Sequence, residues 1–231
     1  MPCRPRTSAA QKTVRRSSFH RSRGELGSED SGQLSGYFAP ETDQEKHNLE
    51  PIIARWSDWT GTGVEHLVLT HNTDAITADA AVLSDGDGRF AARYRVVCDP
   101  GWRVRLTEVE LIGDERRLRL SSDGQGHWLD AQANPLHNLD GAVDIDLSIT
   151  PFTNTLPIRR MDLAPGQFAD IAAAYIRVPV LTVTKDPQRY SCIEYRARYR
   201  YESLDSDFVR EIETDRDGLV VIYPGLFRRI Y

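Results

Sequence analysis

Apolar residues recur at every second position along much of the chain after residue 52, and no other feature constrains the fold as strongly. Residues 143–150 alternate strictly between apolar and polar side chains, and residues 90–98 and 193–201 show the same period. Successive side chains of a β-strand point to opposite faces, so this alternation indicates half-buried strands. Many short strands at such spacing are typical of a barrel or sandwich. Only residues 168–175, with three consecutive alanines, allow a short helix.

Two Asp-Gly turns predict how neighbouring strands are joined. Residues 76–82 and 90–98 flank the sequence DGDG at 85–88, and residues 209–214 and 219–223 flank Asp217-Gly218. Alternating stretches on both sides of an Asp-Gly pair are a strong hairpin signal. These turns resemble fragments of a calcium loop, but neither supplies the bidentate glutamate that closes such a loop. We therefore expect two hairpins.

A slip in the alternation predicts curvature. Trp102, Val104 and Leu106 fall on even positions, whereas Val109 and Leu111 fall on odd ones. One extra residue near Thr107-Glu108 would produce this slip as a β-bulge, and bulges bend strands. The expected fold is therefore all-β: a curved antiparallel sheet that forms a partly open barrel, with at most a short helix.

The first fifty-one residues differ from the rest in composition. Residues 1–24 carry only basic charges and residues 25–50 mainly acidic ones, while apolar residues are sparse and show no period. Such a segment buries too little apolar area to offset its ordering entropy. We expect a disordered tail over 1–51 and one β domain over 52–231. The tail is either without a specific role, a targeting peptide, or a basic arm for an anionic surface.

Composition excludes several functional classes. The net charge of −5 gives no basic stripe for nucleic acid, and no apolar stretch is long enough to span a membrane. The chain starts without the apolar core of an export signal, and its three cysteines lack metal-ligand or disulfide spacing. No nucleophile elbow, phosphate loop or dinucleotide fingerprint occurs. These observations predict a cytoplasmic protein with no catalytic residue set, no metal and no cofactor.

Two charged rows have the spacing of strand faces. Asp144 and Asp146 lie two residues apart, as do Arg196, Arg198 and Arg200. If the rows face each other, they pair and specify strand register. If they line a cavity, they form a polar wall for a head group, a phosphate or a sugar.

Several sequence blocks resemble a bacterial family designated "putative glycolipid-binding". The longest is DIDLSITPFTNTLPIRR at residues 144–160, and the others are CDPGWR at 98–103, DGQGHW at 123–128, and DGLV with YPGLF at 217–227. The resemblance covers about residues 53–231. It implies a curved β fold like that of carriers that shelter lipids in an open half-barrel. Ala142 departs from the pattern, since a cysteine is expected there, so a thiol role at this point is excluded.

The central block itself suggests a loop that leaves the sheet. Pro151 and Pro157 cannot donate to a sheet ladder, so the strand ending at Thr150 must turn away. Thr153 and Asn154 can then satisfy the backbone of the loop or bind sugar hydroxyls, and Arg159 suits an anion. The candidate ligand-binding residues are Trp102, Asp144, Asp146, Thr153, Asn154, Arg159, Tyr195, Arg196, Arg198, Tyr199 and Arg200.

Three classes of function remain open. The leading hypothesis is a binding protein whose curved sheet encloses a partly apolar pocket for an amphipathic molecule such as a glycolipid. The second is an enzyme that acts on an intracellular anionic small molecule, with Asp144 or Asp146 as acid or base. The third is an interaction module with an open sheet edge.

Overall fold

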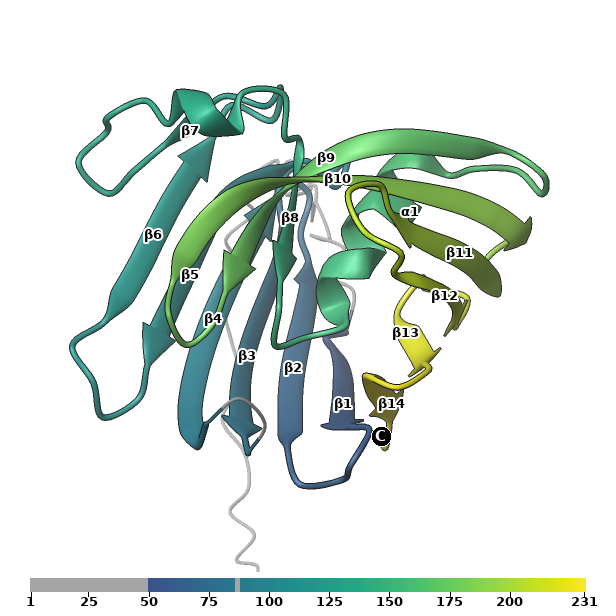
Figure 1. Cartoon of the computed structure of the whole chain (residues 1–231), viewed down its shortest axis with the longest axis horizontal. Helices are drawn as coiled ribbons and strands as arrows, with labels where there is room; N and C mark the ends of the chain where they lie inside the picture. The colour runs from purple at the N-terminus through teal and green to yellow at the C-terminus, as the bar shows by residue number, and fades with distance from the viewer. Residues whose placement is uncertain (1–49, 86–87) are drawn as a thin grey trace, which may run out of the picture. The chain divides into compact units, whose positions relative to one another are not determined.

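The computed structural model describes residues 50–85 and 88–231, which build a single sheet of fourteen strands (Figure 1). Residues 1–49 of the predicted tail, and Gly86 and Asp87 of the first hairpin, lie outside the described residues. The strands are β1 Ile52–Asp58, β2 Val64–His71, β3 Ile76–Ser84, β4 Phe90–Cys98, β5 Val104–Leu111, β6 Arg117–Ser122, β7 Trp128–Leu129, β8 Asp144–Leu147, β9 Phe168–Arg177, β10 Thr182–Glu194, β11 Arg198–Ser203, β12 Val209–Thr214, β13 Val220–Tyr223 and β14 Phe227–Arg229. The helical segments are η1 His137–Leu139, η2 Phe152–Asn154 and α1 Thr155–Met161.

The sheet is curved and open, as the sequence predicts. Its strand order is β7-β6-β5-β4-β3-β2-β1-β14-β13-β12-β11-β10-β9-β8, so β7 and β8 are its edges. Neighbouring strands are antiparallel except β8 and β9, which are parallel. Figure 1 shows β1–β6 as one wing and β9–β14 as the other, with β8 and α1 across the space between them. The two wings meet where β1 pairs with β14.

The larger core cluster of the described residues lies on the inner face of the first wing, and a smaller one, with Tyr190, Tyr199 and Ile212, lies on the second wing. Alternate residues of β3 and β4 point inward, as the periodicity predicts, and β8 and α1 pack against them. Ile145, Leu147 and Leu156 are at most 1 % exposed in this cluster. Cys98 is a buried core residue, and burial raises the pKa of its thiol well above the ordinary value. Both predicted hairpins are present, as β3–β4 and β12–β13.

The helix prediction at residues 168–175 is wrong, because this stretch is strand β9. It pairs with β10 along its whole length and with β8 on its other side. Ala173 and Ala174 are fully buried within the sheet, where small side chains allow β8 and the core to pack closely. The helix α1 lies instead in the segment that the sequence predicted to be a loop. The strand does leave the sheet after β8, as Pro151 required.

Two further irregularities lie elsewhere than predicted. The register between β4 and β5 shifts between Val97 and Cys98, so the extra residue is Arg105 rather than one near Thr107-Glu108. The stretch 193–201 is not one strand, because a turn over residues 195–197 separates β10 from β11. Arg196 has a left-handed backbone (φ 55°) within this turn. The alternation there reflects two strands joined by a turn.

No helix within residues 50–85 and 88–231 combines the length and the apolar character needed to cross a membrane.

Candidate ligand-binding site

Two adjoining hollows, one largely apolar and one polar, form the candidate site. The first, here called the apolar hollow, has a volume of about 390 Å³. Its walls are mainly aromatic and aliphatic, and include Trp56, Trp59, Val64, Val82, Leu83, Phe90, Ile149, Val178, Leu226 and Phe227. Ligand pockets typically measure 300–1,000 Å³ and carry a few polar groups among apolar walls. This hollow has both properties.

The second, here called the polar hollow, measures about 370 Å³. Its polar wall residues are Asp146, Ser148, Thr150, Asn154, Tyr175, Asp186, Tyr201, Ser203, Asp205, Ser206 and Tyr223. Ser148, Tyr175, Leu226 and Phe227 belong to the walls of both hollows. The two hollows therefore adjoin, and a single molecule could place its apolar part in one and its polar part in the other.

Glu65 on β2 is a buried carboxyl group in the wall of the apolar hollow. Its Oε1 atom accepts hydrogen bonds from the Tyr94 hydroxyl at 2.5 Å and the Thr150 hydroxyl at 2.8 Å. Desolvation raises the pKa of Glu65 to about 7, and these hydrogen bonds only partly oppose the shift. Sequence reasoning missed this residue. The signal was present, because Glu65 has the same parity as the inward-facing Leu67 and Leu69.

Asp146 lies in the wall of the polar hollow and is held by two neighbours. One oxygen accepts from the Thr153 hydroxyl at 3.1 Å, and the other accepts from the Gln188 amide at 2.9 Å. The same amide also donates to Asp186 at 2.7 Å. Burial, with a smaller contribution from the negative charge of Asp186, raises the pKa of Asp146 to about 6, and its hydrogen bonds to Gln188 and Thr153 only partly compensate. Asp146 is therefore the predicted carboxylate that reaches the site.

Asp144 has a structural partner instead. Its carboxylate and the guanidinium of Arg160 on α1 form two hydrogen bonds, at 3.1 and 2.5 Å. The Asp144 side chain is 1 % exposed and that of Arg160 17 %. This buried, two-point ion pair attaches α1 to β8, and it occupies the carboxylate that the sequence had assigned to a ligand.

The acidic and basic rows do not pair with each other. Arg196 approaches Asp162 at 4.0 Å, and Arg200 approaches Glu202 at 3.3 Å. The rows lie on different parts of the sheet, because β8 pairs with β9 whereas β11 pairs with β10 and β12. The two rows are therefore not on neighbouring strands and cannot form a cross-strand ladder.

The other predicted site residues mostly lie away from the hollows. Tyr195 is exposed and donates to Asp162, whereas Tyr199 is buried and its hydroxyl accepts from the Arg196 backbone. Arg159 stacks its guanidinium over the Trp102 ring at 5.3 Å. Of the predicted ligand-binding residues, Asp146 and Asn154 line the polar hollow, and none lines the described wall of the apolar hollow. Arg198, Arg196, Arg200 and Thr153 are outside these walls, although Thr153 supports Asp146.

Asn154 is largely satisfied within the protein. Its amide nitrogen donates to the Pro151 carbonyl at 3.1 Å, and its side-chain oxygen accepts from the Tyr190 hydroxyl at 2.9 Å. Asn154 is 6 % exposed. Its first role is thus to fix the turn that follows β8, and its second lone pair and amide hydrogen remain the atoms that could contact a ligand.

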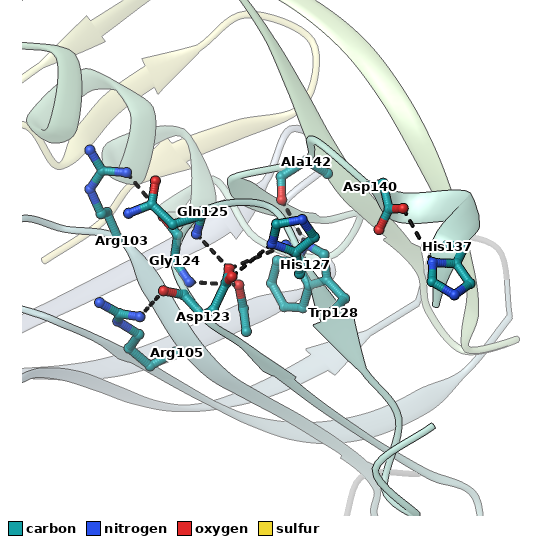
Figure 2. A network of polar contacts seen from close by, with 11 residues as sticks. Arg103, Arg105, Asp123, Gly124, Gln125, His127, Trp128, His137, Asp140 and Ala142 are labelled. Atoms are coloured by element: carbon teal, nitrogen blue, oxygen red, sulfur yellow. Dashed lines mark hydrogen bonds and ion pairs between the residues drawn. The ribbon is translucent and has the colours of Figure 1, made fainter. Parts of the chain in front are cut away.

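The DGQGHW block forms a network that anchors the β6–β7 turn (Figure 2). The Asp123 carboxylate accepts from the Gln125 backbone at 2.7 Å, and it contacts the His127 ring at 2.7 Å. The Gln125 and His127 contacts lower the pKa of Asp123 to about 2. The Trp128 indole then donates to the Ala142 carbonyl at 2.6 Å. This block therefore joins the β6–β7 edge to the segment entering β8, which is a structural role.

The close approach of the Gly141 backbone explains why position 126 of this block is a glycine. Gly126 has φ 97°, and an added Cβ there would lie 2.8 Å from the Gly141 Cα. Their backbones are joined by a hydrogen bond from the Gly141 amide to the Gly126 carbonyl at 2.9 Å. A side chain at Gly126 would push the two segments apart.

A third hollow, the outer trough, lies on the opposite face of β2–β6 and measures about 780 Å³. Its walls include Asp79, Arg93, Arg95, Glu108, Glu110, Arg117 and Arg119. Four of these side chains form ion pairs, Arg95 with Asp79 and Arg119 with Glu108. The trough is a solvent-exposed charged surface.

The fold and the paired hollows define a class of protein: an open, curved β-sheet protein with an amphipathic cavity. Residues 53–229 match the model of the family described as "Putative glycolipid-binding", and the chain belongs to that family. A crystal structure of a DUF1089 family protein from Pseudomonas aeruginosa is similar to this chain, with 37 % sequence identity and a TM-score of 0.63. The match covers 72 % of this chain and 92 % of that one. No protein with a curated description matches significantly.

Proposed function

We propose that the protein binds a glycolipid-like amphiphile, with the alkyl chain in the apolar hollow and the sugar in the polar hollow. The observation that carries this proposal is the shared wall of Ser148, Tyr175, Leu226 and Phe227. Membership of the family supports the same ligand class.

The polar hollow favours an uncharged or cationic head group over an anionic one. Asp146, Asp186 and Asp205 line it, and its described wall contains no basic residue. Sugar hydroxyls can donate to carboxylates, and the rings of Tyr201, Phe208 and Tyr223 provide apolar surface for a sugar ring. The sequence suggested head-group contacts from the arginine row together with Asp144, Asp146, Asn154 and Arg159. The proposed head-group site keeps Asp146 and Asn154 and adds other acidic and aromatic residues.

An enzymatic role for Asp146 is the second candidate. Its pKa of about 6 suits a general acid or base near neutral pH, and it faces a hollow that a substrate could fill. An anionic substrate is disfavoured by the acidic wall. Mass spectrometry of the amphiphile after incubation with the protein distinguishes the two candidates, since a binding protein returns it unchanged.

A reducing cytoplasm remains the predicted location, because Cys98 and Cys192 are both free and buried.

Isothermal titration with decyl β-D-glucoside, kept below its micelle-forming concentration, tests the proposal. We expect saturation at one molecule per chain, and weaker binding of glucose and of decanol, which each fill only one hollow. Leu226→Asp places a charge on the wall that both hollows share, at a side chain that is already 38 % exposed. Ile112→Asp is the matched control, because Ile112 is 56 % exposed and lies in the outer trough.

Leu226→Asp should weaken glucoside binding by about tenfold or more, because the alkyl chain of the ligand would then contact and desolvate a carboxylate. Ile112→Asp should leave it unchanged. Absence of saturation with the folded protein, or equal affinity of the two variants, would contradict the proposed site.

A further inference from the structure

A hydrogen bond between Glu65 and Thr150 connects the walls of the two hollows. Glu65 belongs to the wall of the apolar hollow, and Thr150, which donates to it at 2.8 Å, belongs to the wall of the polar hollow. A ligand that spans both hollows therefore places the junction between its chain and its head group near this carboxyl group.

One oxygen of Glu65 is fully used and the other is not. Oε1 accepts from both Tyr94 and Thr150. The Thr150 hydroxyl also accepts from the Phe152 backbone at 3.0 Å and lies 3.2 Å from the Tyr94 hydroxyl. Oε2 is buried and has no hydrogen-bond partner among the described residues. Glu65 itself is 3 % exposed.

A buried carboxylate oxygen without a partner is costly, and the cost is removed when a donor reaches it. Tyr94 and Thr150 hold the carboxyl group in place from the Oε1 side, so the position of Oε2 is set before a ligand arrives. An ester or ether at the chain–head junction offers only acceptors to this oxygen. A hydroxyl group or an amide N–H offers a hydrogen.

We propose that Glu65 selects amphiphiles whose chain–head junction carries a hydrogen-bond donor, either a hydroxyl group or an amide N–H. This inference rests on the proposed placement of chain and sugar in the two hollows, and it adds the chemical class of the linkage.

Two matched pairs of amphiphiles separate the two donor sources. N-decanoyl-D-glucamine carries an amide N–H that its N-methyl analogue lacks. A 2-hydroxydecyl β-D-glucoside carries a hydroxyl group that its 2-methoxy analogue lacks. At pH 8, above the Glu65 pKa of about 7, the donor-bearing member of at least one pair should bind the wild-type protein roughly fivefold or more tightly, as one satisfied hydrogen bond provides.

Glu65→Gln then tests whether this residue is responsible. The carboxamide keeps an acceptor for Tyr94 and Thr150 and presents N–H groups at the Oε2 position, so the preference should vanish or reverse. Glu110→Gln, on the outer face, is the matched control and should keep it. Thermal melts establish whether both variants are folded. If Glu65→Gln does not fold, the binding of the paired amphiphiles to the wild-type protein still tests the proposal.

Equal binding within both pairs, or a preference that Glu65→Gln retains, would overturn the role of Glu65. If all four amphiphiles bind equally and Leu226→Asp still weakens them, the proposed function stands and this inference fails. If none of the four binds, the proposed function fails as well.

Discussion

The outer trough and the two adjoining hollows use charge in opposite ways. In the trough, which is larger at about 780 Å³, Arg95 and Asp79 lie 3.8 Å apart with side chains 51 % and 57 % exposed. In the hollows, burial raises the pKa of Glu65 to about 7 and that of Asp146 to about 6. Exposed ion pairs add little to stability because their charges stay hydrated. A buried carboxyl group, by contrast, carries a desolvation penalty when it ionises.

The volume of a hollow therefore does not by itself identify a binding site. The trough is an ordinary consequence of alternation, since outward residues of adjacent strands pair across the sheet. The hollows contain groups whose hydrogen-bonding capacity the protein leaves partly unused, as Oε2 of Glu65 shows. A ligand gains most where such capacity remains.

The largest expected effect comes from breaking a buried ion pair and comparing it with an exposed one. Asp144→Asn leaves the mostly buried Arg160 without its counter-charge and should lower the free energy of unfolding by about 3–5 kcal/mol. Asp79→Asn in the trough should cost less than about 1 kcal/mol. Urea denaturation measures both, and equal losses would remove the distinction between the two regions.

A pH dependence tests the burial of Glu65. Its pKa is raised from 4.5 to about 7 in the folded protein. The folded state therefore holds this proton more tightly than the unfolded chain does, and the wild type loses stability as pH rises from about 4.5 through 7. Glutamine does not titrate. Between pH 5 and pH 8 the stability of Glu65→Gln relative to wild type should rise by about 1–3 kcal/mol.

Urea denaturation at several pH values gives this difference. The pKa of Asp146 is also raised, so the wild type loses further stability as pH rises. Glu65→Gln retains Asp146 and loses the same amount, so this contribution cancels in the comparison. Glu110→Gln on the outer face should show a constant difference from wild type. A constant difference for Glu65→Gln would show that Glu65 is solvated.

Double-mutant cycles sharpen the comparison at the level of single contacts. Asp146 and Gln188 should couple by about 1–2 kcal/mol, as a partly buried, charge-assisted hydrogen bond does. Arg119 and Glu108 in the trough should couple by less than about 1 kcal/mol, and 1 M salt should reduce this coupling. Asp146 and Arg198, from the two rows that do not pair, serve as the reference and should be additive within about 0.5 kcal/mol.

The smallest effect is expected from removing the segment before Pro51. Its polar, aperiodic composition predicts that it adds little to the stability of the domain. A chain that begins at Pro51 should melt at the same temperature as the full chain and bind decyl glucoside equally well. A fall of many degrees would show that residues 1–50 contribute to the domain.

The local sequence pattern was enough to predict strands β3 and β4 of the first wing, and the sequence blocks were enough to indicate the family. Residues 76–82 and 90–98 carry the period of two and an Asp-Gly turn, and these local signals suffice because a hairpin pairs residues that are close in the chain. The exit of the chain from the sheet after β8 was also predictable from a local signal, since Pro151 cannot donate a hydrogen bond to a sheet ladder. Among the candidate site residues, Asp146 and Asn154 line the polar hollow, and the sequence indicated them through the strand alternation and the loop after Thr150.

The tertiary structure alone decided which polar groups face the hollows. Glu65 and Thr150 are 85 positions apart, and Asp144 and Arg160 belong to a strand and a helix that the sequence read as a strand and a loop. Residues 168–175 became a strand because β8 and β10 supply hydrogen bonds on both sides. Burial and hydrogen-bond partners depend on neighbours that the fold brings together from distant parts of the chain, and local periodicity carries no information about them.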